Sequence, residues 1–519
     1  MKKLILLLSA ASLIPACSMQ PTYERPQAPI PASWPKGDAY LATSEAGLPS
    51  LDFNQVFADK RLQWLIGDAL RNNRDLRQAA ANIASARAQY RIQRADLLPQ
   101  IDASGGATVS HGSAGGANFG AGPGTGNPNG NPNGGGNGNQ GGQAFVGSND
   151  GTQTFYTASV GATAFEIDLF GRVRSLSEAA LDQYFATEAA ARSTRLALVG
   201  DIATGWLTYG ADKSLLAIAQ DTLDSAQKSV DLTNARLKGG VAPRTDLRQA
   251  QIVLEQARAD LAQQKTALAQ DVNRLRLLVG ADFDPSVLPT SIDDATSHLG
   301  PVPVGLDSGI LLRRPDVVQA EYQLRSMNAQ IGAARAALFP RISLTALLGL
   351  ASTSLSGLFD GDGFNWQVRP NVSYPIFRAG AGVAGVAQAE AEHDAALANY
   401  EKTIQTAFRE VADALARRGT IDEQVAAVQS LTDATQDNYR LSYARYKGGV
   451  DSFLQSLDAQ RSLYSARRSL VQVKLTRGTN LANLYQALGG DSTLDATANG
   501  PVPVEQGAVV ASPTPASNP

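Results

Sequence analysis

The stretch RYKGGVDSFLQSLDAQRS, from Arg445 to Ser462, places two adjacent glycines between segments that are rich in helix-forming residues. A closely similar stretch, RLKGGVAPRTDLRQAQ, runs from Arg236 to Gln251. The second copy follows the first at a constant offset, since 445 minus 236 is 209, and the same offset relates Lys238 to Lys447. The chain of 519 residues is therefore an internal duplication, and its organisation has to be read as two related halves.

Each glycine pair follows a very long helical stretch, about 171–238 in the first half and about 379–447 in the second. The second stretch spans 447 minus 379 plus 1, or 69 residues, which is roughly 100 Å of unbroken helix at ~1.5 Å per residue. Apolar residues recur with the spacings of coiled-coil seams. The seam positions are Leu216, Ala219, Leu223, Ala226, Val230, Thr233 and Leu237 before the first glycine pair, and Leu247, Leu254, Leu261, Leu268 and Leu275 after it.

These seams are narrow and rich in alanine, whereas a helix in a solid bundle has a broader apolar stripe. The pattern favours helices that are wetted on two opposite faces, as in the wall of a water-filled tube. Because glycine adopts the left-handed conformation that ends a helix, each pair is predicted to close the tip of an antiparallel helical hairpin. Thr245 and Asp246, and likewise Asp451 and Ser452, are predicted in the first turn or cap of the returning helix.

Each half also contains a strand hairpin, predicted at about 100–168 and 341–376. The stretch FNWQVRPNVSY, from Phe364, alternates apolar and polar side chains and predicts a strand with one apolar face. Residues 112–150 consist mostly of Gly and Asn, and this composition predicts a loop that buries no core. Four strands cannot close a barrel around a channel, so several copies of the chain would have to combine.

The first residues are typical of a bacterial export signal. Lys2 and Lys3 precede an apolar run, and IPACS ends at Cys17, the only cysteine in the chain, followed by Ser18. We interpret 1–16 as a lipoprotein signal peptide and Cys17 as the lipidated residue, although Pro15 departs from the usual lipobox. An ordinary secreted protein is the alternative. No later stretch has the ~20 apolar residues of a transmembrane helix, and a net charge of −3 argues against nucleic-acid binding.

No catalytic or metal-binding motif is found in the sequence. The three histidines, His111, His298 and His393, lie far apart, and the glycine-rich tract lacks the strand and helix context of a nucleotide site. We therefore expect neither an enzyme nor a cofactor or metal.

The chain resembles the outer membrane factor family, TolC-like efflux channels of the NodT/OprM lipoprotein type. The resemblance rests on LLRRPDVVQAEYQLRSMNAQIGAARAALFPRISL (Leu311–Leu344), FEIDLFGRVR (Phe165–Arg174), YPIFRAGAGVAGV (Tyr374–Val386) and RYKGGVDSFLQSLDAQRSLYSAR (Arg445–Arg467). It implies an α+β membrane protein: a homotrimer with one twelve-stranded outer-membrane barrel, four strands per protomer, continuing into a long periplasmic α-helical barrel.

On this reading the expected segments follow the duplication. They are the leader 1–16, an extended arm 17–58, repeat 1 at 59–280 with its helical hairpin at 171–280, an equatorial linker 281–315, repeat 2 at 316–489 with its helical hairpin at 379–489, and a partly disordered tail 490–519. The linker and the residues after Gly489 would form a belt around the tube.

The resemblance also implies functional residues at the hairpin tips. Asp458 and Arg461 would be the polar residues of a periplasmic gate, Leu454 an apolar ring and Tyr446 a latch. Gly239, Gly240, Val241, Gly448, Gly449 and Val450 would receive a periplasmic adaptor (membrane fusion) protein. The expected function is passive conduction from that adaptor and an inner-membrane transporter, of RND type, to the exterior.

Several alternatives stay open. Asp458 and Arg461 could be an ordinary solvated pair on a helix surface, which contributes little. The chain could also be a channel for type I protein secretion, or a structural coiled-coil lipoprotein. The sequence does not name the cargo.

Overall fold

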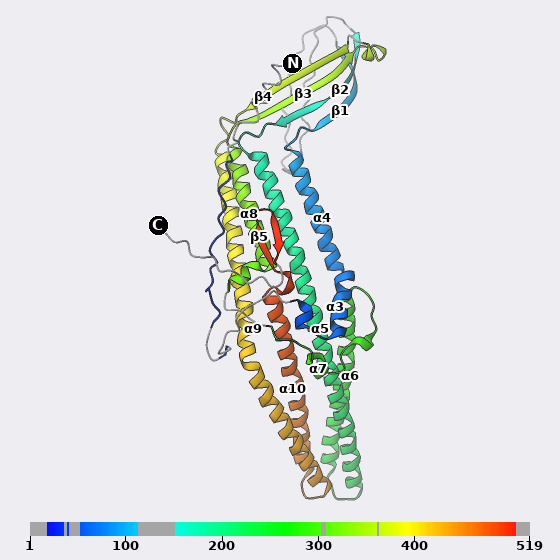
Figure 1. Ribbon diagram of the computed structural model, residues 1–519. Helices are drawn as coiled ribbons and strands as arrows, with labels where there is room; N and C mark the ends of the chain where they lie inside the picture. Colours follow the sequence, from blue (N-terminus) through cyan, green and yellow to red (C-terminus); the bar gives the residue numbers. More distant parts are fainter. Residues whose placement is uncertain are drawn as a thin grey trace, which may run out of the picture. The chain divides into compact units, whose positions relative to one another are not determined.

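The computed structural model describes residues 18–35, 39–40, 52–112, 151–302, 308–360 and 363–504, and Figure 1 shows the chain as a ribbon. Cys17, the predicted signal peptide, residues 113–150 of the predicted loop and residues 505–519 lie outside this part of the chain. The described residues divide into two compact units. The strand unit comprises Arg94–Phe170 and Phe339–Arg378, and the helical unit comprises Ser18–Gln93, Gly171–Leu338 and the chain from Ala379 onwards.

The strand unit is an antiparallel sheet with the strand order β1-β2-β3-β4. Its strands are β1 (Ile101–Gly112), β2 (Gly151–Glu166), β3 (Arg341–Ser352) and β4 (Phe364–Ser373). Each repeat contributes one hairpin, and β2 pairs with β3 across the two repeats. At Gly161 the two strands approach so closely that an added Cβ would lie 2.1 Å from the carbonyl oxygen of Ala346. Glycine is needed there because no side chain fits.

The sheet exposes the apolar face that the alternation predicts. Phe364, Trp366, Val368 and Val372 of β4 are between 56% and 68% exposed. Soluble monomers rarely expose such a contiguous apolar patch, so this face is expected to meet another apolar surface. Within the described residues, β1 and β4 have no partner strand on their outer sides.

Two helices of 67 residues dominate the helical unit, and they occupy the stretches in which long helices are expected. They are α5 (Arg172–Lys238) and α9 (Ala381–Lys447), and α6 (Arg244–Val279) and α10 (Phe453–Ala487) return alongside them. Both long helices start after a glycine with positive φ, Gly171 at 79° and Gly380 at 84°. The seam positions Ala219, Ala226 and Thr233 are at most 1% exposed, because they lie in the contact of α5 with its neighbours.

Shorter helices lie between the middle of the helical unit and the end opposite the hairpin tips (Figure 1). They are α3 (Lys60–Asn72), α4 (Arg74–Ala95) and α8 (Pro315–Ala336). Asp59 caps α3 by accepting a hydrogen bond from the Arg61 N–H at 2.8 Å. The helices α3 and α4 are separated at Asn73.

The two repeats join their helices by equivalent contacts. The Asn73 side-chain amide donates to the carbonyl oxygen of Leu278, near the end of α6, over 2.7 Å. Arg314 donates to the carbonyl oxygen of Ala487, at the end of α10, over 2.8 Å. The acceptors stand 209 residues apart, since 487 minus 278 is 209, which is the repeat offset. In the first repeat the residue just before α4 binds a carbonyl oxygen at the end of α6, and in the second repeat the residue just before α8 binds one at the end of α10. The last carbonyl groups of a helix have no partner within the helix, so each contact satisfies one of them.

A set of belt elements packs around the middle of these helices. It consists of residues 18–35, α2 (Phe53–Val56), η2 (Pro285–Val287), α7 (Ile292–Thr296), η3 (Ser308–Arg313), η6 (Gly490–Ser492), β5 (Leu494–Thr497) and β6 (Gly500–Pro503). Two of them differ from the sequence expectation. The expected extended arm contains α2, and the start of the expected tail forms the β5-β6 hairpin, in which Leu494 is fully buried beside Phe185 and Tyr322.

A buried ionic cluster holds residues 18–35 against α8. Glu321 of α8 is fully buried and forms ion pairs with Arg25, at 2.7 Å, and with Arg325, at 2.6 Å. The Arg325 guanidinium also lies over the rings of Tyr23 and Tyr322, at 4.9 and 5.0 Å from their centroids. A buried carboxylate needs such partners, since leaving it uncompensated costs several kcal/mol.

Candidate functional site

The tips of the two helical hairpins have the same backbone structure. At the first tip the N–H groups of Gly239, Gly240 and Val241 donate to the carbonyl oxygens of Ala235, Leu237 and Arg236. Gly448, Gly449 and Val450 repeat these bonds at the second tip, on Ala444, Tyr446 and Arg445. The second glycine of each pair is left-handed, with φ of 73° at Gly240 and 76° at Gly449. The glycine pairs therefore cap the helices as the sequence predicts.

The same turns expose an apolar side chain at each tip. Val241 is 73% exposed and Val450 is 66% exposed. An added Cβ at Gly240 would meet no atom within 4 Å. At Gly449 an added Cβ would lie 3.3 Å from Nη2 of Arg236, so the Arg236 side chain partly covers the second tip. Both tips thus expose a valine side chain, and at the first tip the adjacent glycine backbone is open to the approach of another helical hairpin.

An ion pair closes the second tip. Arg445 donates from Nε and Nη2 to the two carboxylate oxygens of Asp451, at 2.6 and 2.9 Å. The Arg445 guanidinium holds the pKa of Asp451 below its usual value. At the first tip the equivalents of Arg445 and Asp451 are Arg236 and Ala242, so Arg236 has no carboxylate at that position to pair with. It lies over the ring of Tyr446, 4.6 Å from the centroid, and so links the two hairpins.

Three of the four predicted gate residues share one face of α10. Leu454, Asp458 and Arg461 are spaced by four and three residues, and all three side chains are exposed. The opposite face of α10 is buried through Phe453 and Leu457. Within the described chain, Asp458 and Arg461 have no hydrogen-bond or ion-pair partner, so the face is free for contact outside this chain.

The structure places Tyr446 away from that face. Its side chain is 2% exposed and packs against Phe453, with ring centroids 5.3 Å apart. The Tyr446 hydroxyl lies 3.3 Å from Oγ1 of Thr233 on α5. Tyr446 is therefore a contact between the two hairpins rather than a member of the exposed face.

A polar network further along the helices joins the hairpins as well. The hydroxyls of Ser225 on α5 and Tyr439 on α9 are 2.6 Å apart. Arg467 on α10 pairs with Asp221 on α5 at 2.5 Å, and the Tyr464 hydroxyl donates to Asp260 on α6 at 2.6 Å. Burial raises the pKa of Tyr464 to about 12, with Asp260 adding to the effect. Sequence reasoning missed this inter-hairpin network because its members are far apart in the chain.

Neither a metal site nor a membrane-spanning helix is found in the described part of the chain. No group of three or more His, Cys, Asp or Glu side chains there is arranged to hold a metal ion. None of the described helices combines the length and apolarity that crossing a membrane requires.

The fold is that of solved outer-membrane channels. It matches the crystal structure of the open state of the MtrE outer membrane channel from Neisseria gonorrhoeae with a TM-score of 0.75, at 33% identity, over 91% of this chain and 98% of that one. Residues 65–281 and 307–490 match the family model for outer membrane efflux proteins. The chain belongs to this outer membrane efflux protein family.

Two similar relatives carry names that refer to different cargo. The antibiotic efflux pump outer membrane protein ArpC of Pseudomonas putida is 42% identical over 491 residues, covering 94% of this chain and 96% of that protein. The toluene efflux pump outer membrane protein TtgC, also of Pseudomonas putida, has the same identity and coverage.

Proposed function

We propose that this chain is the outer-membrane channel of a tripartite efflux pump, and that three copies form one conduit. The observation that carries the proposal is the sheet of the strand unit. In the described part of the chain it has four strands and two outer edges without a partner strand, and the apolar side chains Phe364, Trp366, Val368 and Val372 of β4 are between 56% and 68% exposed. Three copies of this sheet, joined edge to edge, would form a twelve-stranded barrel, which satisfies the edge hydrogen bonds and turns the apolar face to lipid.

The helical unit would form the periplasmic part of the conduit. Toward the tips α5 is buried only along a narrow seam, as a wall with water on both sides requires. Residues 196–211 of the same helix are instead buried on most sides, at the level of the belt elements. The belt elements would surround this tube from outside. Cys17 would add a lipid anchor in the same membrane.

The face formed by Leu454, Asp458 and Arg461 would narrow the periplasmic end. In a threefold assembly three copies of Asp458 crowd around one axis, and like charges at short range repel. Arg461, one turn further along α10, would balance them. The contacts of Tyr446 and the inter-hairpin network would hold the two hairpins of each protomer together, and so hold the gate in its resting position.

The glycine-closed tips would receive the periplasmic adaptor. Val241 and Val450 offer apolar contact area, and the open backbone at Gly240 would allow the adaptor backbone to approach. Conduction through the channel would be passive. The energy would come from an inner-membrane transporter, of RND type, that the adaptor connects to the channel.

The alternatives from the sequence are weaker. A purely structural coiled-coil lipoprotein is not favoured, because that function does not account for a four-stranded sheet with an exposed apolar face. A channel for type I protein secretion is not favoured, because the relatives are named for efflux pumps. Since two relatives of equal similarity are named for antibiotics and for toluene, overall similarity does not decide the cargo.

The proposal is tested by deleting the gene and measuring which toxic compounds accumulate in the cells. Restoring the chain should lower the accumulation of at least one compound, provided that the adaptor and the inner-membrane transporter are present. The proposal fails if accumulation is the same with and without the chain for every compound to which the intact cells are resistant.

A further inference from the structure

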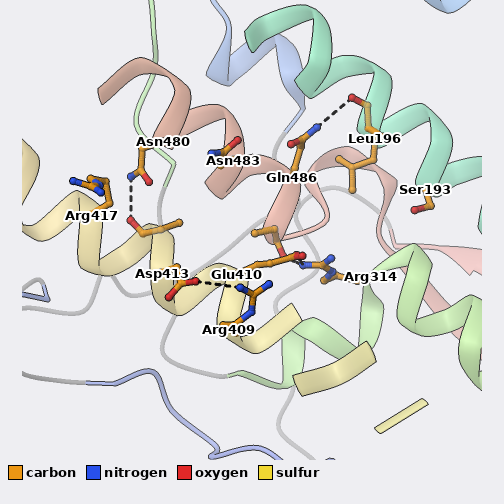
Figure 2. Close-up of a pocket in the computed structure, with 13 residues that line it drawn as sticks. Ser193, Leu196, Arg314, Arg409, Glu410, Asp413, Arg417, Asn480, Asn483 and Gln486 are labelled. Carbon is orange, nitrogen blue, oxygen red and sulfur yellow. Dashed lines mark hydrogen bonds and ion pairs between the residues drawn. The ribbon is translucent and has the colours of Figure 1, made fainter. Parts of the chain in front are cut away.

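A cavity of about 590 Å³ lies in the helical unit between α5, α9 and α10, beside the start of α8 (Figure 2). Its volume is in the range of small-molecule sites. Leu196, Ala197, Ala414 and Ala487 supply apolar lining, while arginines, two carboxylates and three carboxamides supply the polar groups. The cavity can therefore hold a molecule that has both an apolar body and a polar group.

The cavity opens on the side of the helices that faces away from the belt elements. On α9, Phe408 stacks with Trp34 of the belt at 5.3 Å, and Arg417 lies nine residues later. Nine residues are two and a half helical turns, so Arg417 is on the opposite side of α9. On α10, Gly478 faces the belt helix α7, since a Cβ added there would lie 3.2 Å from Cγ2 of Thr296. Asn483, five residues later, is turned by roughly 140° around the helix axis. If the belt is outside the tube, the cavity faces its bore.

Most of the polar groups around the cavity already have partners. Arg314 pairs with Glu410 at 2.9 Å and with Asp316 at 2.8 Å. The Asn480 and Gln486 amides donate to the carbonyl oxygens of Ala414 and Ala197. Arg409 and Asp413 form a loose, exposed pair at 3.8 Å. These contacts are drawn as dashed lines in Figure 2 where both partners are shown.

Two hydrogen-bond donors remain available. Within the described chain, neither the Arg417 guanidinium nor the Asn483 amide has a hydrogen-bond or ion-pair partner. Three arginines line the cavity, and the three carboxylates of Glu410, Asp413 and Asp316 balance their charge. Within the described chain Arg417 is the arginine of the three that pairs with none of these carboxylates. A ligand that supplies hydrogen-bond acceptors and a negative charge would complete this arrangement.

We propose that this cavity is a binding site for organic anions on the cargo path, with the carboxylate or sulfonate on the Arg417 guanidinium and the apolar body in the cavity beside Ala414. The inference rests on the proposed function, because it assumes that cargo passes the bore-facing side of the helices. It deepens that function by naming a cargo class. Three symmetric copies would place three such sites around one level of the bore.

The test uses the purified full-length protein in detergent and 2-naphthoate as the probe. Titration calorimetry should show saturable binding of 2-naphthoate, and 2-naphthalenemethanol, which has the same rings without the charge, should bind at least tenfold more weakly. Arg417→Gln should weaken 2-naphthoate binding at least tenfold, which corresponds to ~1.4 kcal/mol. Asn483→Asp should weaken it as well, because it adds a negative charge to the site. Arg258→Gln is the matched control, since Arg258 is an exposed arginine of α6 outside the cavity, and it should change nothing.

Three results would overturn the inference: no saturable binding of 2-naphthoate, equal binding of the alcohol, or unchanged binding by Arg417→Gln. Each variant is also reconstituted and its channel current recorded, so that a folded protein is tested in every case. A wild-type protein that conducts and lowers cargo accumulation but does not bind 2-naphthoate would refute this inference alone. A protein that neither conducts nor lowers accumulation would refute the proposed function itself.

Discussion

Arg314 donates a hydrogen bond from Nη1 to the carbonyl oxygen of Ala487 over 2.8 Å, and so fastens the start of α8 to the end of α10. The same guanidinium pairs with Asp316 and Glu410, and its side chain is only 9% exposed. The first repeat makes the equivalent contact with a neutral side chain, from Asn73 to Leu278. The contact between these helices is therefore made by a neutral amide in the first repeat and by a guanidinium with two ion pairs in the second. The second repeat is also the one that contains the predicted gate.

Replacing Arg314 should destabilise the helical unit. Arg314→Gln leaves the carboxylate of Glu410 and the Ala487 carbonyl without their partner, and we expect a loss of roughly 3 kcal/mol. Thermal unfolding followed by circular dichroism measures the change. Arg335→Gln is the control, since the pair of Arg335 with Glu390 is exposed and should contribute less than about 1 kcal/mol. Equal losses in the two variants would contradict the assigned role of the junction.

The buried Asp182 should make stability depend on pH. Burial raises its pKa to about 7, and the nearby Glu178 adds to this while Arg325 opposes it. The folded state therefore binds a proton more tightly than the unfolded state, and stability falls as the pH rises from about 4 to 7. Asp182→Asn should raise the melting temperature at pH 8 and leave it nearly unchanged at pH 4. An equal shift at both pH values would show that the charge of Asp182 is not the cause.

The inter-hairpin network should restrain the resting gate. Arg467→Gln combined with Tyr439→Phe removes the contacts of α9 and α10 with Asp221 and Ser225 on α5. We expect a larger resting current in planar bilayers, because the second hairpin is then free to move outward. Arg440→Gln is the control, since Arg440 pairs with Asp437 on the same helix and, among the described residues, with no group of another helix. An unchanged current in the double variant would count against the restraint.

The tips should be needed for adaptor binding but not for channel formation. Val241→Glu with Val450→Glu places charge on the two exposed apolar knobs and should abolish cross-linking to the adaptor. The matched control, Gln263→Glu, adds a charge on the exposed surface of α6 away from the tips. Normal cross-linking in the double valine variant would exclude the tips as the docking surface, and loss of the channel itself would show that the valines are structural.

The repeated elements could be predicted from the sequence because local patterns determine them. Gly171 and Gly380 and the two KGGV tips recur at the 209-residue offset, as do three of the seam leucines, Leu254, Leu261 and Leu275. The long helices lie where these patterns indicate. The shared face of Leu454, Asp458 and Arg461 follows from their spacing on one helix.

What could not be predicted depends on contacts between distant segments. The burial of Tyr446 follows from its packing against Thr233 and Arg236 of the other hairpin, which no local spacing reveals. The β5-β6 hairpin is too short for a periodic signal and is held by α8, where the Tyr322 hydroxyl donates to the Thr497 carbonyl. The available donors of Arg417 and Asn483 become visible only once α9 and α10 are side by side.

Single-channel recording in planar bilayers tests the central claim most directly. We predict that the wild-type protein forms pores with a small resting conductance, and that Asp458→Ala combined with Arg461→Ala increases this conductance by opening the narrow end. A wild-type protein that forms no pores would contradict the channel assignment, and a double variant whose current equals that of the wild type would contradict the gate.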